Sequence, residues 1–300
     1  MWLALSALTV ASSLPAIPRG CEGSFQECRR IVTVINNAYS FSDTVYARQM
    51  QSVVCYARRH GYGYYQLNPA DFSACSKFSS NFFFAKHCAV AEYLETRVKH
   101  KALLYILDGD VVEANPRVRL ETFDYFNSDI TFYERLWNPE VMSGNYIVQN
   151  TFFARAFLRF WTRFFYKQPP GFSSADNGAL HAALALFARA RPDVASPCET
   201  GYANLTTDVT NLTLYFKWIK TCRNILQPDS FLEGIINKTR GKIFIAKKGT
   251  CFVADGAFLG WSINKNAGYP PLYHGIKDKH DLKSDNNGCW VINKTKKINE

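Results

Sequence analysis

The sequence lacks several patterns that would define a protein class at once. None of its nine cysteines forms a Cys-x-x-Cys pair, which argues against a zinc site. It has no internal repeat and no low-complexity tract, and an aromatic content of 15% argues against disorder. Beyond the N-terminus, no segment approaches the roughly 20 apolar residues that a membrane-spanning helix needs. Three hundred residues, 47% of them hydrophobic, therefore predict a folded protein with a sizeable core.

The N-terminus has the pattern of a secretory signal. Residues 2–14 are apolar or small and uncharged, and prolines follow them. Ala11 and Ser13 suit the −3 and −1 positions of a cleavage site after Ser13. We therefore assign residues 1–20 to a signal peptide or, as the alternative, to a short uncleaved anchor. The expected location is the lumen of the endoplasmic reticulum or Golgi, or the outside of the cell.

The cysteines and the glycosylation motifs agree with that location. Cysteines in an oxidising compartment mostly pair, and the odd number leaves at least one thiol that is free or intermolecular. Cys88, on the apolar face of a predicted helix, is the candidate for a free thiol. Four Asn-x-Ser/Thr motifs, three of them after residue 205, predict N-glycosylation at Asn204, Asn211, Asn237 and Asn293.

The net charge of +10 favours anionic partners such as nucleotide phosphates, acidic glycans or membrane surfaces. Nucleic acid does not fit a secreted chain, and the alternative is a basic surface with no particular partner. Arg155, Arg159 and Arg163 recur every four residues on a predicted helix, so they share one face. We expect that face to be solvated.

Strands and helices alternate in the first half of the chain. Apolar patterns predict strands at 31–35, 62–67 and 103–107, with helices at 45–59 and 82–99 between them. This order predicts an α/β fold with a mainly parallel, twisted sheet flanked by helices. Ligands of such sheets bind at the carboxyl ends of the strands.

The second half is less regular. Strands are predicted at 129–133 and 146–148 and helices at 152–165 and 176–190, after which the pattern weakens beyond Pro197. A hairpin around Gly249 is expected from 242–246 and 251–253. We assign residues 21–285 to one catalytic domain and 286–300 to a polar C-terminal tail.

The motif Asp108-Gly109-Asp110 directly follows the apolar run 103–107. Two carboxylates at this spacing can reach one hard cation, and the glycine lets the backbone approach a ligand closely. A cation held in this way usually carries substrate phosphates as further ligands, which suits an enzyme acting on a nucleoside diphosphate joined to a sugar. The alternative is an ordinary solvated turn, since Asp and Gly are common in turns.

Four segments in this order resemble the nucleotide-diphospho-sugar transferases of the A-type glycosyltransferase fold. They are the acidic strand end at 104–110, the Gly-containing strand at 143–150, the helix start at 176–180 and the Tyr-His-Gly-Ile-Lys segment at 273–277. Within this superfamily the likeness is to the fungal galactosyl/mannosyltransferases and plant xylosyltransferases. It is greatest to a related nematode family of transferase-like proteins, over residues 30–285.

The resemblance implies a role for each matching residue. Asp108, Asp110 and His274 would hold Mn²⁺ (or Mg²⁺), with Asp110 the more direct ligand. Asp176 and Asn177 would lie beside the reacting carbon. The residues implied in donor binding are Asn36, Lys86, Asp108, Gly144, Asn145, Gly275 and Lys277.

The implied activity is a metal-dependent, retaining hexosyl or pentosyl transfer from a UDP-linked donor to a glycan or glycoprotein. The alternatives are an inactive transferase-like protein that binds glycans and a secreted disulfide-rich interaction domain. Single residues also have plainer explanations: Asp176 as a helix N-cap, His274 as a packed histidine, Lys86 as a surface lysine and Gly144 as a turn residue. Two departures from the motifs, Asn177 in place of Gln and Asp278-Lys279-His280 after Lys277, leave the donor open.

Overall fold

The computed structural model describes residues 29–35, 46–125, 127–188, 192–206, 212–224, 226–255, 270–277, 282–285 and 288–292. Several sequence predictions fall outside these ranges: the signal peptide or anchor at 1–20, Asn36, Asn211, Asn293, Cys21 and Cys28. Within the described part, no helix combines the length and the apolar character needed to cross a bilayer.

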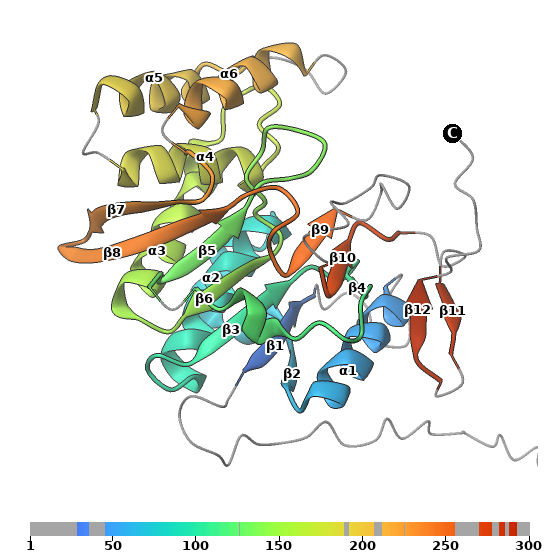
Figure 1. Cartoon of the computed structure of the whole chain (residues 1–300). Coiled ribbons are helices and arrows are strands. Elements are labelled where there is room, and N and C mark those ends of the chain that lie inside the picture. Colours follow the sequence, from blue (N-terminus) through green and yellow to red (C-terminus); the bar gives the residue numbers. More distant parts are fainter. Residues whose placement is uncertain are drawn as a thin grey trace, which may run out of the picture.

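A seven-stranded sheet forms the centre of the protein (Figure 1). In spatial order its strands are β2 (Gly63–Leu67), β1 (Arg30–Val34), β3 (Leu103–Leu107), β6 (Tyr146–Gln149), β5 (Ile130–Tyr133), β8 (Thr239–Ala246) and β7 (Ser230–Ile236). Strand β1 is parallel to β2 and β3, and β5 is parallel to β8, whereas β6 and β7 are antiparallel to their neighbours. Five strands thus share one direction, and the predicted α/β fold is confirmed with a mixed sheet.

Helices cover both faces of this sheet (Figure 1). One face carries α2 (Phe82–Arg97), α3 (Phe152–Thr162) and α4 (Asp176–Phe187), and α5 (Pro192–Ala203) and α6 (Thr213–Arg223) complete the same core beyond α4. The other face carries α1 (Ala47–His60).

Strand β3 shows why the sequence folds in this way. Leu104 and Ile106 enter the core under α2 and α3, while Tyr105 and Leu107 enter the core under α1. Successive side chains of a strand point to opposite faces, so a continuous apolar run predicts a strand that is buried on both sides. The polar residues that follow Leu107 consequently stand at the edge of the sheet.

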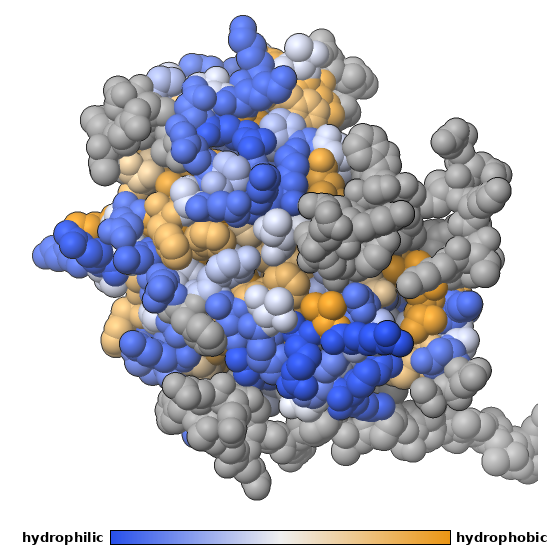
Figure 2. Space-filling model, viewed as in Figure 1, coloured by the Kyte–Doolittle hydropathy of each residue, from blue (hydrophilic) through white to orange (hydrophobic). Residues whose placement is uncertain are grey.

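On the face seen in Figure 2, hydrophilic residues predominate and hydrophobic ones form small, separate patches.

A small second sheet brings a late part of the chain back to that edge. Its strands are β4 (Val112–Glu113), which follows the acidic motif, β10 (Leu272–His274) and β9 (Val253–Asp255). Strand β10 is antiparallel to β4 and parallel to β9, with His274 opposite Asp255. The short helices η1 (Pro69–Asp71), η2 (Ser73–Phe78), η3 (Leu120–Phe123) and η4 (Arg163–Lys167) lie in the connections.

The predicted hairpin around Gly249 is wrong. Strand β8 pairs instead with β7, through a tight turn at Asn237-Lys238 in which both residues have positive φ. Val253 belongs to β9, in the other sheet. Asn adopts positive φ more readily than most residues, so this turn carried a signal that the expected glycine turn obscured.

The predicted polar tail also needs correction. Trp290–Ile292 form β12, which pairs with β11 (Leu282–Ser284), so the folded structure extends beyond residue 285. Cys289 next to it is bonded to Cys55 of α1. A three-residue strand within a polar segment leaves too little periodicity to be recognised.

The prediction of Cys88 as the free thiol is wrong as well, because Cys88 is bonded to Cys75 of η2. A third disulfide joins Cys198 to Cys222, between α5 and α6. Of the cysteines in the described ranges, only Cys251 is free, and it is buried. Cys88 on the buried face of α2 therefore links this helix covalently to η2.

Candidate metal centre

The acidic motif is anchored at the end of β3. The backbone N–H of Asp108 donates to the side-chain oxygen of Asn145, at 2.9 Å. One carboxylate oxygen of Asp108 forms an ion pair with Lys86, a fully buried residue of α2 that also donates to the carbonyl of Gly144, at 2.7 Å. The other oxygen, Oδ2, faces His274.

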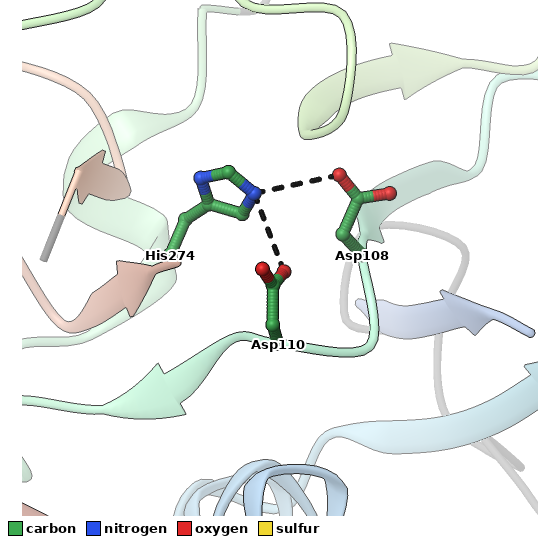
Figure 3. Close-up of side chains that lie close together, drawn as sticks. All are labelled: Asp108, Asp110 and His274. Atoms are coloured by element: carbon green, nitrogen blue, oxygen red, sulfur yellow. Dashed lines mark ion pairs between the residues drawn. The ribbon is translucent and has the colours of Figure 1, made fainter. Parts of the chain in front are cut away.

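His274 completes a cluster with both carboxylates, although it follows Asp110 by more than 160 positions. Figure 3 shows the three side chains pointing toward one another. His274 Nε2 lies 3.3 Å from Oδ1 of Asp110 and 3.5 Å from Oδ2 of Asp108. One ligand atom from each of the three residues lies within 4.8 Å of the others. The predicted proximity of His274 and Asp110 is confirmed.

Asp255, at the end of β9, holds the other side of the imidazole. Its Oδ1 lies 3.3 Å from Nδ1 of His274, and its Oδ2 accepts a hydrogen bond from the backbone of Leu136, at 3.1 Å. A proton on Nδ1 directed at a carboxylate leaves Nε2 as the atom available to a cation. A carboxylate behind a ligating histidine is the common arrangement in metal sites.

The donor set suits a divalent cation. Carboxylate oxygens with one imidazole are typical ligands of Mn²⁺, and oxygen ligands are typical of Mg²⁺. Adjacent ligands of an octahedral ion with bonds of about 2.1 Å lie about 3 Å apart, close to the spacing between Nε2 and the two carboxylates. The arrangement therefore fits the predicted cation with small side-chain movements.

Electrostatics favours a positive charge at this point. Burial opposes ionisation of Asp108, but Lys86 and His274 outweigh it and hold the pKa of this carboxyl well below its usual value. Burial raises the pKa of Asp110, and Asp108 adds to the effect. Burial disfavours the charged imidazole, yet the surrounding carboxylates raise the pKa of His274 to about 9. Without a metal the imidazolium supplies the positive charge, and a bound metal would displace its proton.

Gly144 is required by the close approach of Asp108. A Cβ added at Gly144 would lie 2.0 Å from Oδ2 of Asp108 and 2.6 Å from the side chain of Met142. Gly109 of the acidic motif has a different role, since the ring of Tyr46 packs over it. Only glycine at position 144 leaves room for the carboxylate in its observed position.

The segment after His274 is fixed to the same site. Gly275 has φ of +84°, in the region that favours glycine, and this turn lets the N–H of Ile276 donate to the carbonyl of Asp110, at 3.2 Å. The carbonyl of Ile276 in turn accepts from Gln49 of α1, at 2.8 Å. Lys277 comes next, is exposed, and lies near enough to lower the pKa of Asp110 against the effect of burial.

Three other predicted site residues, Asn145, Asp176 and Asn177, are buried. The side-chain oxygen of Asn177, at the start of α4, accepts from the N–H of Ser143, at 2.8 Å. Asp176 is buried, and its Oδ2 lies 2.9 Å from Nε2 of His87. Asn145 is fully buried and donates to the hydroxyl of Tyr133, at 3.2 Å. Asn177 therefore supports the loop at 143–145. Asp176 does not cap its helix, which begins after Ala175.

The sequence analysis did not identify two residues that contact the predicted site residues, Asp255 and His87. Asp255 ends the apolar run 251–254 and precedes Gly256, the same pattern that marks Asp108. His87 adjoins Lys86 in the sequence but carries no local signal of its partner. It is fully buried, stacks on Trp161 at 3.5 Å between ring centres, and reaches Asp176 across 89 residues.

Burial lowers the pKa of His87 to about 4, so the folded protein should lose stability in mild acid. In the unfolded chain His87 binds a proton with an ordinary pKa near 6.5, whereas in the folded protein its pKa is about 4. This contribution is fully present above pH 6.5, is lost as pH falls toward 4, and amounts to about 3 kcal/mol. We expect urea unfolding from pH 7 to pH 4 to show a steeper loss in the wild type than in His87→Gln. Equal slopes would contradict the assignment.

The family model described as "Protein of unknown function, DUF273" matches residues 53–289, which span the acidic motif, the loop at 143–145 and His274. The chain belongs to this family. No curated protein matches it.

Parts of this DUF273 chain are similar to solved structures. A glycosyltransferase involved in glycosylation of the major capsid of PBCV-1 is 17% identical, with a TM-score of 0.36; the match covers 48% of this chain and 69% of that one. Glycosyltransferase GlyE of Streptococcus pneumoniae TIGR4 matches in two crystal structures. Its apo form is 13% identical over 51% of this chain and 42% of that one, with a TM-score of 0.34. The other is 10% identical over 85% and 55%, with a TM-score of 0.37.

Proposed function

We propose that this protein is a metal-dependent glycosyltransferase that uses a nucleoside-diphosphate sugar, with UDP as the nucleotide. The observation that carries the proposal is the meeting of Asp108, Asp110 and His274 at one edge of the sheet, with Lys277 beside them. The order of motifs noted above is the basis for placing it near the fungal, plant and nematode transferases.

The chemistry of the donor explains why such a cluster is useful. Breaking a bond between a sugar and a diphosphate places negative charge on the leaving phosphate. Asp108, Asp110 and His274 would hold Mn²⁺ or Mg²⁺, which supplies several kcal/mol of charge stabilisation there. The exposed ammonium of Lys277 would bind the diphosphate, and the open backbone at Gly275 leaves room for it.

The sugar would lie toward the loop at 143–145. Gly144 borders Asp108, and Asn177, the neighbour of Asp176 at the start of α4, accepts a hydrogen bond from the same loop. The transition state of sugar transfer carries positive charge on the sugar ring, which an adjacent carboxylate stabilises. Asp176, which His87 orients, is the residue that we assign to this role in a retaining transfer.

The decisive experiment is a panel of nucleotide sugars with Mn²⁺, read as released nucleotide. We expect turnover with at least one UDP-linked donor and none with Asp110→Asn, which removes a ligand charge but keeps the size of the side chain. Donor binding without turnover in the presence of glycan acceptors would instead indicate the inactive glycan-binding protein. Absence of metal-dependent binding would exclude both.

His274 and Lys277 should have separable roles. His274→Ala should weaken Mn²⁺ binding about 10-fold or more, because it removes a ligand. Lys277→Ala should leave Mn²⁺ affinity within threefold but weaken UDP binding in saturating Mn²⁺ by roughly 10-fold, the value of one charged hydrogen bond. Calorimetric titration with Mn²⁺ and then with UDP measures both. Parallel losses in the two variants would contradict separate roles.

The three disulfides found among the described residues support a place in the secretory pathway, where such bonds persist. Asn204 is exposed, and Asn237 is exposed in the turn between β7 and β8. Expression in a eukaryotic secretory host should therefore yield a protein whose mass falls on glycosidase treatment. Asn204→Gln and Asn237→Gln should each remove part of that change. Unmodified peptides at both asparagines would count against the location.

A further inference from the structure

A cavity lies on the outer side of α2, away from the candidate metal centre. It has a volume of about 410 Å³ and lies between η2, α2, the end of α3 and η4. Cys88 and Glu92 of α2 border it, whereas Lys86 lies on the side of α2 that faces Asp108. Helix α2 therefore separates this cavity from the candidate metal centre. Its volume is in the range of small-ligand sites.

Two elements contribute cationic side chains to the border of the cavity. Lys77 comes from η2, and Arg163 and Lys167 come from the two ends of η4. Arg159 also borders the cavity but pairs with Glu92, at 2.9 Å, and with Glu95. The prediction of a solvated arginine face is therefore only partly correct. Arg163 is exposed, but Arg155 is buried and donates to Asn150.

An aromatic side chain completes the cavity. Tyr166 is 63% exposed and packs on Phe78 at 5.8 Å and on Phe165 at 5.0 Å between ring centres. The disulfide between Cys75 and Cys88 ties η2 to α2 next to this aromatic group. The ring of Tyr166 is consequently supported from behind while its surface stays open to a ligand.

We propose that this cavity binds part of an anionic saccharide and holds one or two of its sugar units, which bear sulfate or carboxylate groups. Several positive groups, contributed by η2 and η4, suit a ligand with several separated anionic groups better than a single compact anion. An exposed ring suits the apolar face of a sugar, which buries C–H groups against it. The proposal does not depend on the transferase function, because the two sites share no side chain.

The test uses a sulfated heparin tetrasaccharide as the probe, titrated into the full chain by calorimetry at fixed ionic strength. Arg163→Gln with Lys167→Gln should lower the affinity at least 10-fold. The matched control is Lys217→Gln with Lys220→Gln, which removes two exposed charges from α6 and should lower it less than threefold. Tyr166→Ala, which removes no charge, should lower it about fivefold, and saturation-transfer spectra should show sugar protons at the Tyr166 ring.

Two results would overturn the proposal. Equal losses in the two charge variants would mean that the probe binds the basic surface as a whole. Inorganic sulfate that competes with the tetrasaccharide at equal concentration, together with unchanged affinity in Tyr166→Ala, would mean a simple anion site. Circular dichroism and thermal melts of all variants establish that each one is folded.

Discussion

Gly144→Ala is expected to reduce the affinity for Mn²⁺ by roughly 100-fold, the upper end of the effect of disturbing the surroundings of a metal ligand. The new methyl group would lie 2.0 Å from Oδ2 of Asp108, so the carboxylate must leave its position. It cannot move as a unit with its backbone, because Asn145 holds the N–H of Asp108. Metal-dependent UDP binding should fall with the metal. Titration of the apo protein with Mn²⁺ measures the effect.

A matched control separates this local effect from a general loss of stability. Gly201→Ala also overpacks the core, since its Cβ would lie 2.5 Å from the indole of Trp218, but it lies in α5. Both variants should lose about 1–3 kcal/mol of unfolding free energy from the strain of overpacking. Only Gly144→Ala should lose the metal. Unchanged Mn²⁺ affinity in that variant would mean that Asp108 is not a ligand.

Local sequence pattern predicted some residues of the site and not others. Asp108 and Asp110 follow a run of apolar residues that can only be a buried strand, so their place at the edge of the sheet follows from local pattern. The place of His274 came from a resemblance between short motifs, and no local rule would have put it there. The resemblance implies Lys86 in donor binding, and the plainer alternative was a surface lysine. That alternative is wrong, because Lys86 is fully buried against Asp108. Whether a lysine is exposed or buried depends on which strand its helix covers, which is a tertiary property.

The fold was predictable to a similar extent. The strands and helices up to β3 follow from strong periodicity, and β3 was placed at its observed bounds. Helices α5 and α6 were missed because Pro197 lies inside α5 and because both pack beyond α4 rather than on the sheet. The disulfides were not predictable, since spacing along the chain says nothing of which cysteines meet. The bond between Cys55 and Cys289 joins residues 234 positions apart.

That bond is expected to be a large single contribution to stability. A crosslink over a loop of this length restricts the unfolded chain by about 5 kcal/mol in the chain-entropy model. The double variant Cys55→Ala, Cys289→Ala should lose free energy of unfolding of that order in urea. Noncovalent contacts also hold the segment. Leu282 and Ile292 pack in a small core with Tyr273, and Trp290 donates to Gln51, at 3.0 Å.

Cys251→Ala is the control, since it shortens a buried cysteine that forms no bridge, and it should cost only about 1 kcal/mol of packing. The Mn²⁺ affinity should stay within twofold in both variants. His274 is held by the pairing of β10 with β4 and β9 and by Asp255, and these contacts do not pass through the disulfide. A large loss of Mn²⁺ affinity in the double variant would show that the C-terminal hairpin of β11 and β12 positions His274. In that case the redox state of one bond, formed 15 residues beyond His274, would control the site.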